Sequence, residues 1–231
     1  MSTSKSGTLY GVGVGPGDPD LLTLKAARLI SSAKVIAYPS PEGGESFARS
    51  IVQAHITDGI TEISMDVPMR VERFAAQSVY DTSANTIAEH LRAGEDVVVL
   101  CEGDPFFYGS FMYLHNRLSL EFEVEIVSGV SSLVACAGRV AQPLAGRNDV
   151  LTILPGPMSD EELEQRFALG GSFVIIKVGR HMSRIRALIE KHGLLANAAY
   201  VERATLGEEK RMPLADVDES CVPYFFDDPD L

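Results

Sequence analysis

The sequence predicts an α/β fold built around a mostly parallel sheet. Apolar, β-prone runs alternate with segments of helical period along the chain. One run, residues 96–101, is apolar almost throughout and follows a helical segment, which is typical of a parallel strand covered on both faces. The 231 residues suffice for one large domain or for two domains of ordinary size.

The first elements are a strand over residues 8–10, a glycine-rich turn over 11–19 and a helix over 20–30 with Asp20 as its cap. The turn is not a dinucleotide-binding fingerprint, because Pro16 and Asp18 stand where that pattern needs glycine. Glycine lets a backbone approach a ligand closely. The turn is therefore either a ligand loop or a packing turn.

Further strands are expected over residues 34–38, 61–68, 96–101 and 123–127, with helices over 47–54, 71–91 and 133–140. The strand over 96–101 ends in a second Gly-Asp-Pro turn, residues 103–105, and the next strand ends in Ser128 to Ser132. Ligands bind at the carboxyl ends of parallel strands, so these turns favour a binding cleft. Ser131 and Ser132 either cap a helix or contact the ligand.

The second half predicts strands over residues 149–154, 172–178 and 198–201, with edge strands over 210–213 and 223–226. Helices are expected over 160–169, capped by Ser159, and over 182–191, ended by Gly193.

The charge balance argues against nucleic acid, because the net charge is −12 and such ligands need a basic surface. No run approaches the length of a membrane span, and residues 1–7 lack the apolar core of a secretory signal. Cys101, Cys136 and Cys221 have no metal-ligand spacing, and the five histidines are scattered. We therefore expect a cytoplasmic protein without a disulfide framework or a metal site.

Cationic residues near strand ends are either a site for an anionic ligand or solvated ion pairs. They are Arg70, Arg73, Arg139, Arg147, Lys177, Arg180, Arg184 and Arg203. Glycine turns without a nucleophilic triad are compatible with methyl transfer from a sulfonium donor, because the donor itself carries the activated methyl group. Such an enzyme has to align the reactants and exclude water.

Four motifs resemble those of the tetrapyrrole (corrin/porphyrin) methylases across nearly the whole chain. They are residues 11–19 with 22–27, residues 103–109, residues 128–132 and residues 201–205. Ser128 departs from the proline that is usual in the third motif.

The resemblance implies an N-terminal domain over residues 1–120 with a mostly parallel sheet and a mixed α/β domain over 121–231. It also implies a homodimer that binds S-adenosyl-L-methionine in the cleft between these domains and releases S-adenosyl-L-homocysteine. Donor contacts then fall on Pro16, Gly103, Asp104, Phe107, Ser131, Ser132, Val178, Ala204 and Thr205. The substrate is a reduced tetrapyrrole with eight carboxylates, for which we expect contacts from Arg147, Lys177, Arg180 and Arg203. Asp104 and Tyr108 are the candidate proton acceptors.

Within the family, residues 38–48, 101–113, 177–180 and 223–225 resemble the members that methylate precorrin-2 at C20 to give precorrin-3A in cobalamin biosynthesis. Pro39 replaces the aspartate usual in uroporphyrinogen III methylases, and the C-terminal tail departs from the family pattern. The alternatives are the cobalt-bearing substrate of the anaerobic route, another methylation position, a diphthine or ribosomal-RNA methylase, and a tetrapyrrole carrier without catalysis.

Overall fold

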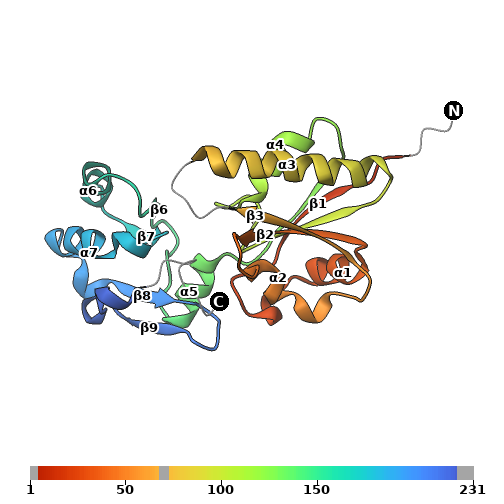
Figure 1. The fold of residues 1–231 in the computed structure, drawn as a ribbon. Coiled ribbons are helices and arrows are strands. Elements are labelled where there is room, and N and C mark those ends of the chain that lie inside the picture. The colour runs from red at the N-terminus through yellow and green to blue at the C-terminus, as the bar shows by residue number, and fades with distance from the viewer. Residues whose placement is uncertain (1–4, 68–72, 223–231) are drawn as a thin grey trace. The chain divides into compact units, whose positions relative to one another are not determined.

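The computed structural model of the chain describes residues 5–67 and 73–222 and divides into two compact units between Ser132 and Leu133 (Figure 1). The boundary that we predicted at residue 120 lies too early. The strand β5 (Val124–Val127) pairs with β1 (Leu9–Gly13) and so completes the sheet of the first unit. The pairing of β5 with β1 therefore keeps residues 124–127 in the first unit.

The first unit is built on one five-stranded sheet in which every pairing is parallel, in the order β3-β2-β4-β1-β5. Its other strands are β2 (Val35–Pro41), β3 (Thr61–Val67) and β4 (Val97–Cys101). The register aligns Gly13 at the end of β1 with Cys101 at the end of β4. The two glycine-rich turns therefore leave the sheet at the same edge.

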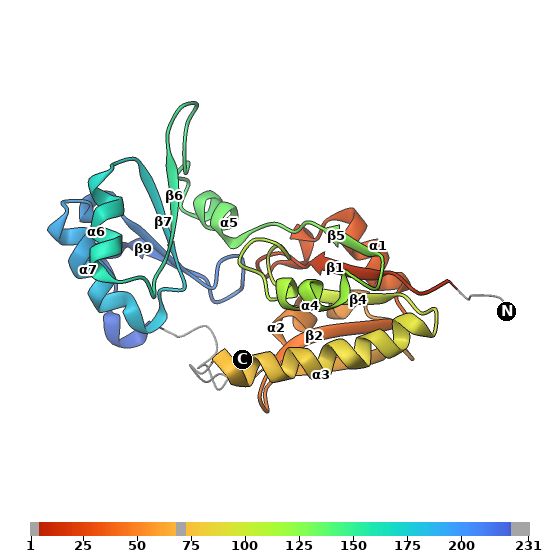
Figure 2. The ribbon, with the colours of Figure 1, turned by 90° about the horizontal axis from the view of Figure 1, so that it is seen from above.

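Helices cover both faces of this sheet, with α1 (Leu24–Ser32) and α2 (Phe47–Ile51) on one face and α3 (Arg73–Arg92) and α4 (Phe111–Leu118) on the other (Figures 1 and 2). Along β4, Val97, Val99 and Cys101 join the cluster beneath α3 and α4. Val98 and Leu100 join the cluster beneath α1 and α2. All five side chains are buried, which confirms the prediction of a strand covered on both faces.

The first helix begins later than we predicted. Pro19–Leu21 is a 3₁₀ turn capped by Asp18, whose carboxylate accepts a hydrogen bond from the amide of Asp20. Helix α1 starts at Leu24, after Thr23 caps the amide of Ala26. Asp20 is therefore not the cap, because Pro19 opens a separate turn ahead of it. Helix α4 was not among the predicted elements.

The second unit holds two small sheets, one parallel between β6 (Leu151–Pro155) and β7 (Ser172–Ile176) and one antiparallel between β8 (Ala199–Glu202) and β9 (Lys210–Pro213). The helices α6 (Asp160–Ala168) and α7 (Met182–Lys191) pack on a core that includes Leu163 and Ile185. Ser159 and Glu162 form the capping box that starts α6. The mixed architecture confirms the predicted fold class.

Shorter elements complete the description. The helix α5 (Ser132–Arg139) follows β5, and 3₁₀ turns occur at Pro19–Leu21, Gln53–His55, Gly179–His181, Leu195–Asn197, Leu214–Asp216 and Glu219–Cys221. Cys101 is buried and Cys136 is half-buried. The predicted edge strand at 223–226 and Arg70 lie outside the described residues. Within residues 5–67 and 73–222, no helix is both long and apolar enough to cross a membrane.

Gly11, in the middle of β1, provides a test of this packing because the Phe111 ring of α4 lies directly against it. A Cβ at position 11 would overlap three atoms of that ring. We expect Gly11→Ala to lower the free energy of unfolding by about 2 kcal/mol, as overpacking does in tight cores. Denaturant unfolding of Gly11→Ala, Phe111→Leu and the double variant measures the effect. If the ring is the obstacle, the double variant loses less than the sum of the two single variants.

Candidate functional site

The topology of the first sheet predicts a ligand site at the carboxyl ends of β1 and β4. These strands are neighbours, yet β1 leads to α1 on one face and β4 leads to α4 on the other. Ligands of open α/β sheets bind where adjacent connections diverge in this way, outside the carboxyl ends of the strands. We name the segments at this edge the first loop (residues 14–18), the second loop (102–109) and the third loop (128–131).

Backbone hydrogen bonds join the first loop to the end of β4 and to the second loop. The amide of Val14 donates to the carbonyl of Cys101 at 2.9 Å. Gly15 and Gly103 form an antiparallel bridge, in which the Gly103 amide donates to Gly15 at 2.8 Å and the Gly15 amide donates to Gly103 at 3.3 Å. The two glycine turns of the sequence are thus one hydrogen-bonded unit.

The third loop packs so closely that side chains are excluded. A Cβ on Gly13 or on Gly129 would collide with the Gly103 carbonyl oxygen. Gly103 differs from both, because its φ is +62° and its nearest neighbour on the Cβ side is Ser131 Cα at 3.9 Å. Gly13 and Gly129 are therefore needed for packing, whereas a Cβ at Gly103 would make only ordinary van der Waals contact with the third loop.

Asp104 connects the second and third loops through its carboxylate. One oxygen accepts from the Phe106 amide at 2.9 Å, and the other accepts from the Gly129 amide at 3.1 Å. Both oxygens are thus engaged by backbone donors. This arrangement supports a loop-fixing role for Asp104 alongside the donor contact that we predicted.

Glu102 is a candidate functional residue that our sequence analysis missed. It directly follows the buried strand β4, and desolvation by the surrounding chain raises the pKa of its carboxyl group to about 7. Burial raises the pKa values of Tyr80 on α3 and of Cys101, and the charge of Glu102 adds a smaller effect of the same sign. The sequence signal for Glu102 was an acidic residue directly after a fully apolar strand. Carboxyl groups with strongly shifted pKa values are common at active sites.

The remaining predicted residues of the first unit lie on these three loops. Pro16 and Phe107 are half-buried, and Tyr108 is exposed with its ring edge-on to Phe107 at 5.1 Å. Ser131 ends the third loop and Ser132 begins α5. The structure therefore brings the predicted contacts of the first unit to one edge of the sheet.

In the second unit, the predicted residues follow two strand ends. Lys177, Val178 and Arg180 follow β7, and Arg203 to Thr205 follow β8. Backbone strain marks the same places. Among the described residues, five other than glycine have a positive φ: Tyr108, Ala141, Lys177, Arg203 and Thr205. Four of these five are residues that we predicted for the site, and strained backbone tends to cluster at functional sites.

Several of the cationic residues from the sequence analysis have carboxylate partners. Arg139 pairs with Glu209, Arg184 with Asp160, and Arg203 with Glu208. Arg147 is exposed and belongs to no helix or strand; it lies in the segment before β6. For Arg139 and Arg184 these pairs favour the structural interpretation over ligand contact.

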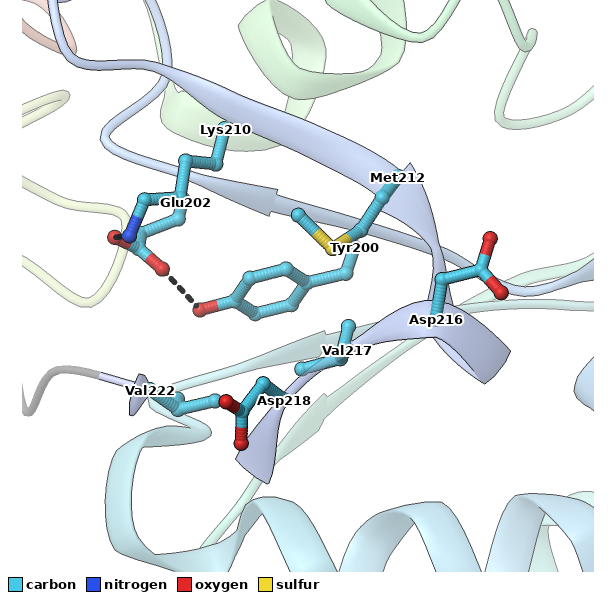
Figure 3. A pocket seen from close by; sticks show the side chains of 8 residues that line it. All are labelled: Tyr200, Glu202, Lys210, Met212, Asp216, Val217, Asp218 and Val222. Atoms are coloured by element: carbon cyan, nitrogen blue, oxygen red, sulfur yellow. Dashed lines mark hydrogen bonds and ion pairs between the residues drawn. The ribbon is translucent and has the colours of Figure 1, made fainter. Parts of the chain in front are cut away.

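The second unit also contains a hollow of about 190 Å³ beside the β8–β9 hairpin, lined by Tyr200, Glu202, Lys210, Met212, Asp216, Val217, Asp218 and Val222 (Figure 3). Glu202 is buried and accepts hydrogen bonds from the Tyr200 hydroxyl at 3.0 Å and from the Lys210 ammonium at 3.2 Å. Burial and the Glu202 charge raise the pKa of Tyr200. None of the predicted site residues lines this hollow, and its buried acid already has partners within the hairpin.

A larger hollow, of about 380 Å³, lies at the carboxyl end of β2 in the first unit and is lined by polar side chains that include Ser40, Ser46 and Arg49. The Arg49 guanidinium donates to both oxygens of Glu62, and the Tyr38 hydroxyl also donates to that carboxylate at 2.7 Å. This hollow shares its edge of the sheet with the three loops, because β2 and β4 are parallel neighbours.

Comparison with known proteins agrees with the motifs. The family model described as "Tetrapyrrole (Corrin/Porphyrin) Methylases" matches residues 8–218. A precorrin-2 C(20)-methyltransferase of Sinorhizobium sp is 39% identical over 97% of this chain and 95% of its own length. A cobalt-precorrin-2 C(20)-methyltransferase of Salmonella typhimurium is 32% identical over 95% of this chain and 94% of its own length.

A cobalamin biosynthesis protein CobIJ of Mycobacterium bovis is 43% identical over 96% of this chain but only 45% of its own length. The chain thus spans about half the length of that relative. Among solved structures, a uroporphyrin-III C-methyltransferase of Thermus thermophilus in complex with S-adenosylhomocysteine is 26% identical, with a TM-score of 0.61 over 90% of this chain and 84% of that one.

The Glu102 carboxyl group predicts a specific pH dependence of stability. Its folded pKa of about 7 lies above the ordinary value of 4.5, so the unfolded chain ionises first as the pH rises. The folded state therefore loses stability between these pH values, and the loss is complete above pH 7. Glu102→Gln removes this penalty, and we expect it to stabilise the protein by roughly 2 kcal/mol at pH 8 and by almost nothing at pH 4. Denaturant unfolding at the two pH values measures the difference, and equal effects at both would contradict the assignment.

Proposed function

Because this chain belongs to the tetrapyrrole (corrin/porphyrin) methylase family, we propose that it transfers the methyl group of S-adenosyl-L-methionine to C20 of precorrin-2, forming precorrin-3A in cobalamin biosynthesis. The observation that carries this proposal is the 39% identity to a precorrin-2 C(20)-methyltransferase along almost the full length of both chains. We further propose that the protein acts in the cytoplasm as a homodimer.

The loops of the first unit suit a methyl donor. Gly103 has no side chain and its backbone is held by hydrogen bonds to Gly15, so in this proposal the donor approaches that backbone closely. In this proposal, donor contacts come from Pro16, Gly103, Asp104, Phe107, Ser131 and Ser132, with further contacts from Val178, Ala204 and Thr205 of the second unit. S-adenosyl-L-methionine supplies an activated methyl group when bound, so the residues have to orient the reactants and exclude water.

A substrate with eight carboxylates needs cationic partners, and the proposal assigns these to Arg147, Lys177, Arg180 and Arg203. The left-handed backbone of Lys177 and Arg203 supports the assignment, because such strain is retained where the surrounding structure has to place a side chain. Arginine suits carboxylates through its fork of N–H donors.

Methylation of a meso carbon ends with the loss of its proton, and we predicted Asp104 or Tyr108 as the acceptor. Asp104 has both oxygens occupied by backbone amides, whereas Tyr108 is exposed on the second loop. Glu102 adds a third candidate, and a second carboxyl group, on the same loop. Its pKa of about 7 allows it to accept a proton at neutral pH and to release it afterwards.

The similarity to a cobalt-precorrin-2 C(20)-methyltransferase supports a second candidate, methylation of the cobalt-bearing substrate at the same carbon. Turnover of metal-free and cobalt-bearing substrate by the same preparation separates the two. Since identity is higher to the precorrin-2 enzyme, we expect the metal-free compound to have the larger kcat/KM. A larger value for the cobalt compound would assign the chain to the second candidate.

Calorimetric titration with S-adenosylhomocysteine tests the donor site. We expect micromolar binding by the wild type, and a loss of at least tenfold for Gly103→Ala, because the new methyl group would occupy space that the donor needs beside the Gly103 backbone. Gly59→Ala is the matched control. It has a similarly positive φ of +82° and no atom within 4 Å of its Cβ, but it lies at the opposite edge of the sheet, before β3.

The control should reproduce the strain cost of an alanine at positive φ without changing the affinity. Equal affinities of the wild type and Gly103→Ala would remove the donor from the second loop. An absence of binding by folded wild type would instead favour a tetrapyrrole carrier over a methylase.

A further inference from the structure

The loop between β8 and β9, residues 203–209, holds an unusual backbone conformation at Thr205. Its φ is +72°, and Arg203, two residues earlier, has a φ of +49°. Threonine is β-branched, and a residue of this kind rarely adopts the left-handed region, where its Cβ crowds the backbone. Something in the surrounding structure has to stabilise this conformation.

Glu209, at the other end of the same loop, supplies that interaction. Its carboxylate accepts a hydrogen bond from the Thr205 amide at 2.8 Å. Arg139 of α5 donates its Nε–H to the same carboxylate, at 2.8 Å to Oε1 and 2.7 Å to Oε2. The Glu209 side chain is only 7% exposed, although the loop itself lies at the surface.

Electrostatics keep Glu209 ionised in this role. The Thr205 amide and then the Arg139 guanidinium hold the pKa of the carboxyl group below its usual range, and Arg211 adds a smaller effect of the same sign. Arg139 is itself held in place, because the Arg211 guanidinium donates to its backbone carbonyl oxygen. The anchor thus extends from the loop into α5 and β9.

We propose that Glu209 is a positioning residue for the methyl donor: it holds Thr205 in the left-handed conformation that presents residues 204 and 205 to the donor. The inference rests on the proposed function, in which Ala204 and Thr205 contact S-adenosyl-L-methionine. In this proposal, Glu209 strengthens the binding of the donor by residues 204 and 205, although its own carboxylate does not contact the donor.

A double-mutant cycle in the full chain tests this role, with S-adenosylhomocysteine as the calorimetric probe. Glycine adopts positive φ without the Cβ penalty, so it does not need Glu209 to reach the conformation. We expect Glu209→Ala to weaken binding about tenfold in the wild-type background and no more than about threefold in the Thr205→Gly background. Comparing the two backgrounds removes any effect of losing the threonine side chain itself.

Two further variants separate positioning from stability. Glu209→Gln keeps an oxygen that can accept from the Thr205 amide, so its affinity should fall less than that of Glu209→Ala. Glu219→Ala removes a different ion pair of the second unit, that with Arg186, and should leave the affinity unchanged. Thermal unfolding of each variant shows that a folded protein is being titrated.

The outcomes are distinct. Tenfold weaker binding that the Thr205→Gly background relieves supports the positioning role. Unchanged affinity in Glu209→Ala, or an equal loss in both backgrounds, overturns it while leaving the donor site intact. An absence of binding by the wild type overturns the proposed function itself, before the variants are compared.

Discussion

The backbone bridge between Gly15 and Gly103 is the interaction on which the candidate site depends. It joins the ends of β1 and β4, neighbouring strands whose connections leave toward opposite faces of the sheet. Because Gly13 and Gly129 carry no Cβ, the third loop can pack directly against the same bridge. Three segments that are far apart in the sequence thereby lie together at one edge of the sheet. A site made of backbone suits methyl transfer, in which the donor carries the reactive group and the protein supplies alignment.

Carboxylates fix the loops of both units in a similar way. The Asp104 carboxylate accepts hydrogen bonds from the amides of Phe106 and Gly129. The Glu209 carboxylate accepts hydrogen bonds from the Thr205 amide and the Arg139 guanidinium. Charge-assisted hydrogen bonds of this kind are short and strong, so a single side chain can hold an irregular segment. Glu102 has a different role, since desolvation raises the pKa of its carboxyl group to about 7. Asp104 and Glu209 therefore anchor loops, whereas the Glu102 carboxyl group exchanges a proton near neutral pH.

Local patterns predicted much of the fold because their physical causes are local. The apolar run that became β4, the Ser159 cap of α6 and the Gly193 stop of α7 all appear where the sequence placed them. The first helix shows the limit, because Pro19 opened a separate 3₁₀ turn and Thr23 became the cap. Helix α4 was not predicted, because it follows directly on the second glycine turn. The boundary between the units lies after β5, because β5 pairs with β1.

The sequence by itself determined the class of fold, the order of most elements, the glycine turns and the family, since all of these lie in contiguous stretches of chain. The tertiary structure decided what each charged group does. Asp104 meets Gly129 across 25 positions, and Glu209 meets Arg139 across 70. The desolvation of Glu102 likewise depends on chain that packs around it from other elements. Hydrogen bonding and burial are properties of neighbours in space, so only the folded chain separates an anchor from a group that titrates near neutral pH.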